Sequence, residues 1–162
     1  MVSLKYKSGF TMIELISVIV ILGVLAATAL PKFVNLSSDA RVAAVNSMVG
    51  TLKSAAYLWR AKCAATPTCN LTTGASTVTE NGITYGIWHG WLDAGDNTGL
   101  SATWSEIDMA ITYQGFTVSL ISPNGHRFSP NSAKTPSTCY AQYDNAMGAG
   151  LDGLVTSVVT GC

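Results

Sequence analysis

The sequence predicts an α+β protein in which a long N-terminal helix packs on a small antiparallel sheet, giving a ladle-shaped molecule. Three observations lead to this prediction. Residues 10–30 form an apolar run in which Glu14 is the one charged residue. Apolar residues then recur at helical spacing to about residue 62. Short segments with the composition of strands follow. The chain has 162 residues, which is enough for one small domain beside a membrane segment.

The apolar run is long enough to cross a membrane. Its 21 residues would form a helix about 31 Å long, close to the thickness of the hydrocarbon core of a bilayer. Lys5 and Lys7 precede the run and predict a cytoplasmic N-terminus, with the residues after Lys32 on the other side. Glu14 is unusual there, because a carboxylate inside a membrane helix is costly and usually marks a pairing with a cation.

The residues around Glu14 carry a resemblance to a known family. A short basic leader and an apolar run flank the residues Gly9, Phe10 and Thr11-Met12-Ile13-Glu14. This arrangement resembles the prepilin signal of type IV pilins. The stretch ALPKFVNLSSDAR, residues 29–41, resembles the mannose-sensitive haemagglutinin class of major pilins. The resemblance covers about the first 40 residues closely and the rest in outline.

This resemblance implies processing and assembly at named positions. Residues 1–9 would be a leader peptide, cut between Gly9 and Phe10 by a membrane prepilin peptidase, and Phe10 would then be N-methylated. Glu14 would pair with the N-terminal amine of a neighbouring subunit. Two opposite charges that are too costly to bury singly are better tolerated as a pair in a low dielectric.

Residues 10–31 would be the transmembrane and polymerisation helix, with weak points at Gly23 and Pro31. Glycine costs about 1 kcal/mol within a helix and an interior proline about 3 kcal/mol. We expect the helix to kink or open there, and the resemblance implies that residues 23–31 are extended in the assembled fibre. A simple kink at Pro31 is the alternative.

Two other interpretations of the N-terminus stay open. An ordinary secretory signal peptide could be cut after Ala29, and a plain one-pass anchor would also account for the length of the run. A charge at Glu14 is unfavourable for the first and unexplained by the second. Neither accounts for Gly9-Phe10 followed by Glu14.

Residues 32–62 are predicted to form an amphipathic helix. Its narrow apolar stripe favours packing of one side against a sheet, and a coiled coil fits less well because the stripe lasts under three heptads. Arg41, Asn46, Lys53 and Arg60 fall outside the stripe. The stripe comprises Val42, Val45, Val49, Leu52, Ala56 and Trp59.

Residues 63–162 are predicted to form a β-rich head. Residues 63–82 have loop composition, residues 83–92 and 110–121 have strand character, and Phe116, Val118 and Leu120 would share one face of the latter. Pro123-Asn124-Gly125 predicts a turn, and a return strand would begin at His126. Shorter candidate strands are residues 139–143 and 154–159.

Four cysteines in a small domain outside the membrane indicate disulfides, with three possible connectivities. We favour Cys63 with Cys69, which closes a short spacer containing Pro67 where the helix should end. The pilin resemblance implies Cys139 with Cys162, bounding a C-terminal loop, residues 139–162. The spacings do not suit a zinc site.

No catalytic constellation is present in the sequence, so we expect no enzyme and no cofactor. Asp93, Asp96 and Asn97 are weak candidates for calcium ligands, although a polar turn is the favoured interpretation. Residues 10–63 carry a charge of 5 − 2 = +3, and residues 64–162 carry 2 − 7 = −5. The basic part of one copy could attract the acidic part of another, or both could simply be solvated. The acidic head argues against nucleic acid binding.

The expected function is that of a structural subunit of a type IV pilus, serving adhesion, aggregation or motility. The alternatives are a type II secretion pseudopilin and a minor pilin that binds a ligand at the fibre tip. Expected partners are other copies of the chain, the prepilin peptidase and assembly machinery, and a host or abiotic surface. The precursor would lie in the inner membrane with its head in the periplasm, and the processed chain in an extracellular pilus.

Overall fold

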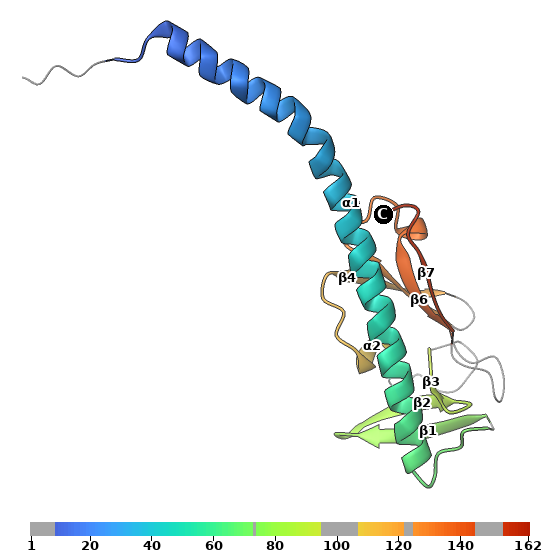
Figure 1. The fold of residues 1–162 in the computed structure, drawn as a ribbon. Helices are drawn as coiled ribbons and strands as arrows, with labels where there is room; N and C mark the ends of the chain where they lie inside the picture. The colour runs from blue at the N-terminus through green and yellow to red at the C-terminus, as the bar shows by residue number, and fades with distance from the viewer. Residues whose placement is uncertain (1–8, 73, 95–106, 122–124, 145–153) are drawn as a thin grey trace, which may run out of the picture. The chain divides into compact units, whose positions relative to one another are not determined.

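The computed structural model describes residues 9–72, 74–94, 107–121, 125–144 and 154–162. The chain divides into two compact units, Met1–Ser38 and Asp39–Cys162, which we describe separately. Helix α1 (Met12–Ala65) belongs to both, and every other helix and strand that is described lies in the second (Figure 1). The architecture is α+β, with a long N-terminal apolar helix and small antiparallel sheets, as the sequence predicts.

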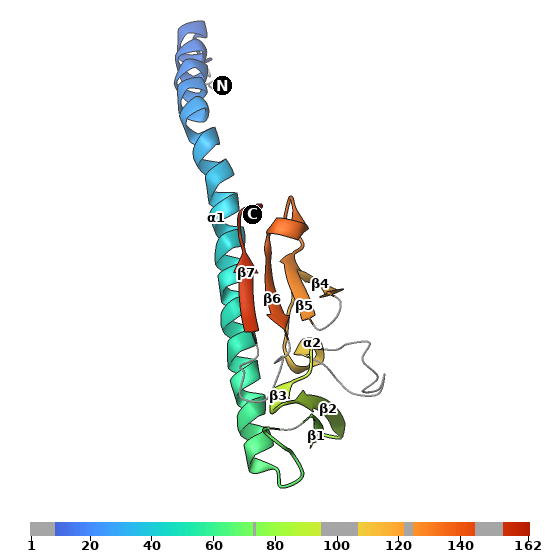
Figure 2. The same cartoon turned by 90° about the vertical axis from the view of Figure 1, so that its right-hand side faces the viewer.

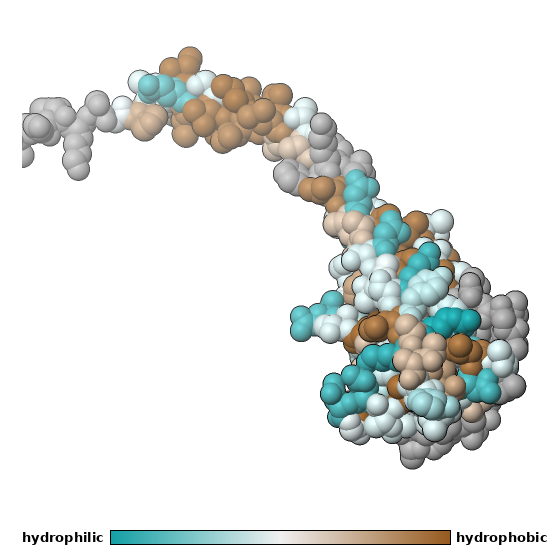
Figure 3. Space-filling model, turned by 60° about the horizontal axis from the view of Figure 1, so that its bottom comes forward, coloured by the Kyte–Doolittle hydropathy of each residue, from teal (hydrophilic) through white to brown (hydrophobic). Residues whose placement is uncertain are grey.

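In the first unit, Met12–Ala29 of α1 is apolar and long enough to cross a membrane by length and composition. None of these residues is buried within the chain. Figure 3 shows the resulting hydrophobic surface along the N-terminal stretch of the helix. An exposed apolar surface of this size marks an interaction with lipid or protein.

Helix α1 is continuous through Gly23 and Pro31, so the helix does not open there in this single chain. The predicted kink at these residues stays a prediction. Proline removes one backbone hydrogen bond, whereas opening residues 23–31 would leave many N–H and C=O groups without a partner, which costs more in an apolar medium. The extended conformation expected in an assembled fibre stays a prediction.

The second unit contains two antiparallel sheets where the sequence predicted one. The first consists of β1 (Ala75–Glu80), β2 (Ile83–Trp88) and β3 (Trp91–Leu92). The prediction of a loop over residues 63–82 is therefore wrong for β1, and residues 83–92 form two strands instead of one.

Two tight turns join the strands of this sheet. Asn81 and Gly82 have φ angles of 52° and 81°, and His89 and Gly90 have 49° and 83°. Positive φ at both central residues is the signature of the turns that best match the twist of a hairpin. An added Cβ at Gly90 would also meet Leu71, so this turn packs closely on the preceding loop.

The second sheet consists, in spatial order, of β4 (Phe116–Ile121), β5 (Gly125–Pro130), β6 (Tyr140–Asp144) and β7 (Leu154–Val158), and every neighbouring pair is antiparallel. The return strand from His126 and both shorter strands are confirmed, whereas the strand predicted from Ala110 begins at Phe116. Residues 122–124 of the predicted turn lie outside the described residues. The second unit also contains the short helix α2 (Ile107–Ala110) and the 3-10 helix η1 (Pro136–Thr138).

The predicted face of β4 is only partly buried. Phe116 and Val118 pack against the core, but Leu120 is 69% exposed. Strand β4 is an edge strand, so Leu120 has a cross-strand neighbour on one side alone, His126 of β5.

The core lies between the second half of α1 and the two sheets, which both face this half of the helix (Figure 2). The predicted stripe is confirmed: four of its residues are buried and the other two are partly buried against the same core. The rings of Trp59 and Tyr85 join helix and first sheet with centroids 4.1 Å apart. The buried four are Val45, Leu52, Ala56 and Trp59, and the partly buried two are Val42 and Val49.

Arg41 is the exception among the residues expected outside the stripe, because it is only 8% exposed. Its Nε–H donates a hydrogen bond to the backbone carbonyl of Cys162. The C-terminal segment thus supplies an acceptor that helical periodicity cannot reveal.

Two disulfides connect the second unit, Cys63–Cys69 and Cys139–Cys162. These are the pairs favoured from the sequence. The first lies at the end of α1, and the second joins the start of β6 to Cys162, the residue that Arg41 contacts. In the loop-entropy model they stabilise the fold by about 2.4 and 3.4 kcal/mol respectively.

Candidate functional site

The predicted cleavage position directly precedes helix α1. Gly9 and Phe10 are exposed and not helical, and Phe10 is 89% exposed. Exposed segments outside regular structure are preferred sites of proteolysis, and the Gly9–Phe10 bond lies in such a segment. Residues 1–8 of the predicted leader lie outside the described residues, and cleavage itself stays a prediction.

Glu14 forms a capping box with Thr11 at the start of the helix. The Thr11 backbone N–H and hydroxyl each donate to Glu14 Oε2 over 2.8 Å. In return, the Glu14 backbone N–H donates to Thr11 Oγ1 over 3.3 Å. This reciprocal pattern satisfies backbone donors that have no partner within the helix.

The capping box gives Glu14 a role within its own chain that our sequence reasoning missed. The signal was present, because a threonine followed three residues later by a glutamate is the sequence signature of this motif. Thr11 and Glu14 both follow the predicted cut, so the box is compatible with a chain that begins at Phe10. A carboxylate also interacts favourably with the positive end of the helix dipole.

The hydroxyl groups of the apolar helix are satisfied by its own backbone. Ser17 Oγ donates to the Glu14 carbonyl over 2.9 Å, and Thr28 Oγ1 donates to the Leu25 carbonyl over 3.0 Å. Polar groups that already have partners can be buried without a large desolvation penalty. The helix can therefore enter lipid or a protein interface with these two side chains unchanged.

The weak calcium candidates are not brought together in the described part of the chain. Asp93 is buried, its N–H donates to the Gly86 carbonyl over 2.8 Å, and its own carbonyl accepts from the Ile107 N–H over 3.1 Å. Asp96 and Asn97 lie outside the described residues. Among the residues that were described, no group of three or more His, Cys, Asp or Glu side chains could hold a metal ion.

These features define the class of the protein. A family model described as the prokaryotic N-terminal methylation motif matches residues 4–30. The match includes Gly9, Phe10 and Glu14, together with the candidate membrane span.

Comparison with known proteins then gives the family. The chain is 34% identical over 112 residues to the type IV narrow pilus major component PilA5 of Thermus thermophilus, an alignment covering 69% of this chain and 92% of that protein. It is also 42% identical over 53 residues to a fimbrial protein of Pseudomonas aeruginosa, covering 33% of this chain and 34% of the relative. No solved structure matches significantly. The chain belongs to the type IV pilin family.

Proposed function

We propose that this chain is a structural subunit of a type IV pilus, polymerised through its N-terminal hydrophobic helix into a surface fibre that serves adhesion, aggregation or motility. The observation that carries the proposal is the exposed apolar stretch Met12–Ala29, in a chain that aligns with 92% of a major pilus component. A surface of this kind requires lipid before assembly and other subunits after it.

Processing by a prepilin peptidase is the first step of this proposal. Residues 1–9 are removed as the leader, and the new Phe10 amine is methylated. The exposed, non-helical Gly9–Phe10 bond and the match to the methylation motif support this step.

Glu14 then acts in assembly. Its carboxylate is exposed at the first turn of α1 and offers a partner to the Phe10 amine of a neighbouring subunit. Two opposite charges brought together in an apolar fibre core stabilise each other where either alone would be costly.

In the proposed domain organisation, residues 10–31 anchor the chain and polymerise, residues 32–62 form the amphipathic helix of the head, and residues 63–162 form its β-rich globular part. The precursor lies in the inner membrane with a cytoplasmic N-terminus and a periplasmic head, and the processed chain becomes extracellular. The Cys139–Cys162 disulfide supports a fibre subunit over a secretion pseudopilin, because this pair is the one that the pilin resemblance implies. Assembly requires no catalytic activity or cofactor of the chain itself.

Mass spectrometry of sheared surface fibres tests the proposal. We expect the chain to be a main component, beginning at an N-methylated Phe10. A mature chain beginning at Leu30 would instead support an ordinary signal peptide. Absence of the chain from the fibres would contradict the structural role.

A further inference from the structure

A short loop joins the end of α1 to β1 (Figure 1). It contains Asn70-Leu71-Thr72, which has the pattern Asn-x-Ser/Thr of an N-glycosylation acceptor, with a residue other than proline in the middle. Asn35-Leu36-Ser37 is a second match in the chain. The two matches differ in their structural setting.

The middle residue of the Asn70 motif anchors the loop. Leu71 packs against the hydrophobic core, and a Cβ added at Gly90 would lie 2.8 Å from its Cδ2. The Asn70 backbone N–H donates to Ser76 Oγ over 3.0 Å. Asn70 and Thr72, on either side of Leu71, are both exposed. The fold therefore presents the two residues that an N-glycosylation motif requires at the surface of the second unit.

Thr72 donates twice to the carboxamide oxygen of Asn70. Its backbone N–H donates to Asn70 Oδ1 over 2.8 Å, and its hydroxyl donates to the same oxygen over 3.0 Å. Donors placed where negative charge develops stabilise that charge. A carboxamide oxygen gains negative charge when the amide nitrogen loses a proton, so these two bonds favour Asn70 Nδ2 as a nucleophile.

The Asn35 motif lies in a different backbone conformation. Residues 35–37 are within helix α1, where the side chains of residues two positions apart do not face each other. The helix therefore offers no counterpart of the bond from the Thr72 hydroxyl to Asn70. By this criterion Asn70 is the favoured acceptor and residue 35 is not.

The turn alone does not require an asparagine at position 70. An aspartate accepts the same two hydrogen bonds and forms the same kind of turn. What asparagine adds is an amide nitrogen, the atom to which a glycan is attached.

We propose that Asn70 is an N-glycosylation site whose donor is an oligosaccharide linked to a polyprenyl pyrophosphate. Asn70 Nδ2 bonds to the anomeric carbon of the first sugar as the bond from that carbon to the pyrophosphate oxygen breaks. The nitrogen gives one proton to a base of the transferase, and the polyprenyl pyrophosphate leaves with the electron pair of the broken bond. The inference rests on the proposed function for the position of the head outside the membrane.

Mass spectrometry of fibres sheared from the cells that naturally make the chain tests this site. After reduction and trypsin digestion, Asn70 lies in the peptide Cys63–Arg127, and Asn35 lies in Phe33–Arg41, which is the internal control. We expect the first peptide to carry sugar mass, located at Asn70 by fragmentation, and the second to be unmodified. An unmodified first peptide, or equal sugar occupancy on both peptides, would overturn the proposal.

Substitutions separate the glycan from the turn. Asn70→Asp keeps an oxygen that can accept both Thr72 bonds but has no amide nitrogen, so all sugar mass should be lost. Thr72→Val removes the hydroxyl and should lower sugar occupancy at least tenfold, whereas Thr72→Ser should keep it within twofold of wild type. Sugar mass that persists in Asn70→Asp would place the modification on another group and overturn the proposal. Occupancy is measured in membrane material as well as in fibres, so that a change in assembly does not conceal the result.

The two levels of inference can fail separately. A chain found in the fibres with an unmodified Asn70 would overturn the glycosylation site while leaving the pilus function intact. Absence of the wild-type chain from surface fibres would contradict the proposed function itself.

Discussion

The phenolic hydroxyl of Tyr143 donates a hydrogen bond of 2.7 Å to the backbone carbonyl of Leu92. Tyr143 lies on β6 of the second sheet and Leu92 on β3 of the first, and both are fully buried. Since the two sheets share no strand, this bond is a direct polar link between them within the core.

Replacing Tyr143 with phenylalanine should lower the free energy of unfolding by about 1–3 kcal/mol, because the Leu92 carbonyl then loses its side-chain donor in a buried setting. Urea denaturation of the detergent-solubilised chain, followed by near-ultraviolet circular dichroism, measures this. Tyr57→Phe is the matched control, since Tyr57 is 58% exposed. Equal loss in both variants would contradict the role of the buried bond.

Stability should also fall in alkali because of Tyr143. Burial, followed by the charges of Asp93 and Asp144, raises the pKa of its hydroxyl far above the ordinary value. Because the pKa is raised, folding favours the protonated hydroxyl. The stabilisation by Tyr143 is therefore complete below about pH 10 and is lost as the pH rises further. The free energy of unfolding should fall by up to about 1.4 kcal/mol per pH unit. Between pH 9 and about 11.5, the free energy of unfolding should fall more steeply with pH for the wild type than for Tyr143→Phe. Parallel curves would disprove the assignment.

Arg41 should stabilise the C-terminal segment through the Cys162 carbonyl. Arg41→Met keeps much of the buried aliphatic volume but removes the donor, so we expect a loss of about 1–3 kcal/mol in the free energy of unfolding. Arg41→Lys should recover little of it, because an ammonium cannot reproduce the guanidinium geometry. The measurement is again urea denaturation, with the exposed Lys53→Met as control. A wild-type midpoint for Arg41→Met would show that the contact contributes nothing.

Features set by local periodicity could be predicted from the sequence. The apolar run and the stripe from Val42 to Trp59 each depend on residues close together in the chain, and both are present in the structure. The strand β1 was missed although Asn81-Gly82 is a strong hairpin signal, because the polar composition of residues 75–80 outweighed it.

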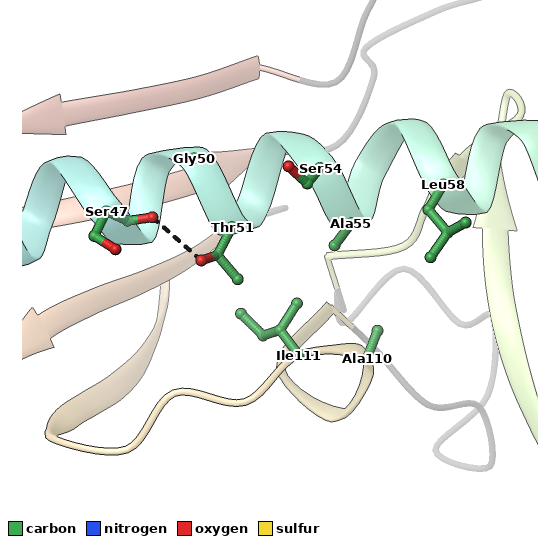
Figure 4. A pocket seen from close by; sticks show the side chains of 8 residues that line it. All are labelled: Ser47, Gly50, Thr51, Ser54, Ala55, Leu58, Ala110 and Ile111. Atoms are coloured by element: carbon green, nitrogen blue, oxygen red, sulfur yellow. Dashed lines mark hydrogen bonds between the residues drawn. The ribbon is translucent and has the colours of Figure 1, made fainter.

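Features set by distant partners could not be predicted. The burial of Arg41 depends on Cys162, and the separation into two sheets depends on how the strands pair. Lys62 of the basic half pairs with Glu80 of the acidic half within one chain, with Lys62 Nζ 3.2 Å from Glu80 Oε2, whereas attraction between different copies stays a prediction. An open pocket beside α1 likewise requires Ala110 and Ile111 to lie near residues 47–58 of the helix, which no sequence pattern indicates (Figure 4).

Glu14 completes the capping box with Thr11, and its proposed pairing with a neighbouring Phe10 amine would be a separate role. The final prediction distinguishes the two. Glu14→Gln retains a side chain that can complete the box but removes the negative charge. Thr11→Ala removes the threonine hydroxyl from the box but keeps the charge. If the charge pairs with a neighbouring Phe10 amine, Glu14→Gln should lose fibres and accumulate processed monomer in the membrane.

Thr11→Ala should then still form fibres, because its Glu14 carboxylate is intact and only the helix end is weakened. Immunoblots of sheared fibres and of membrane fractions, compared with wild type, measure both outcomes. Peptidase cleavage should continue in each variant, since Gly9 and Phe10 are unchanged. Normal fibre yield from Glu14→Gln together with loss of fibres from Thr11→Ala would assign Glu14 to helix capping instead of charge pairing, because that pattern follows the capping interaction and not the charge.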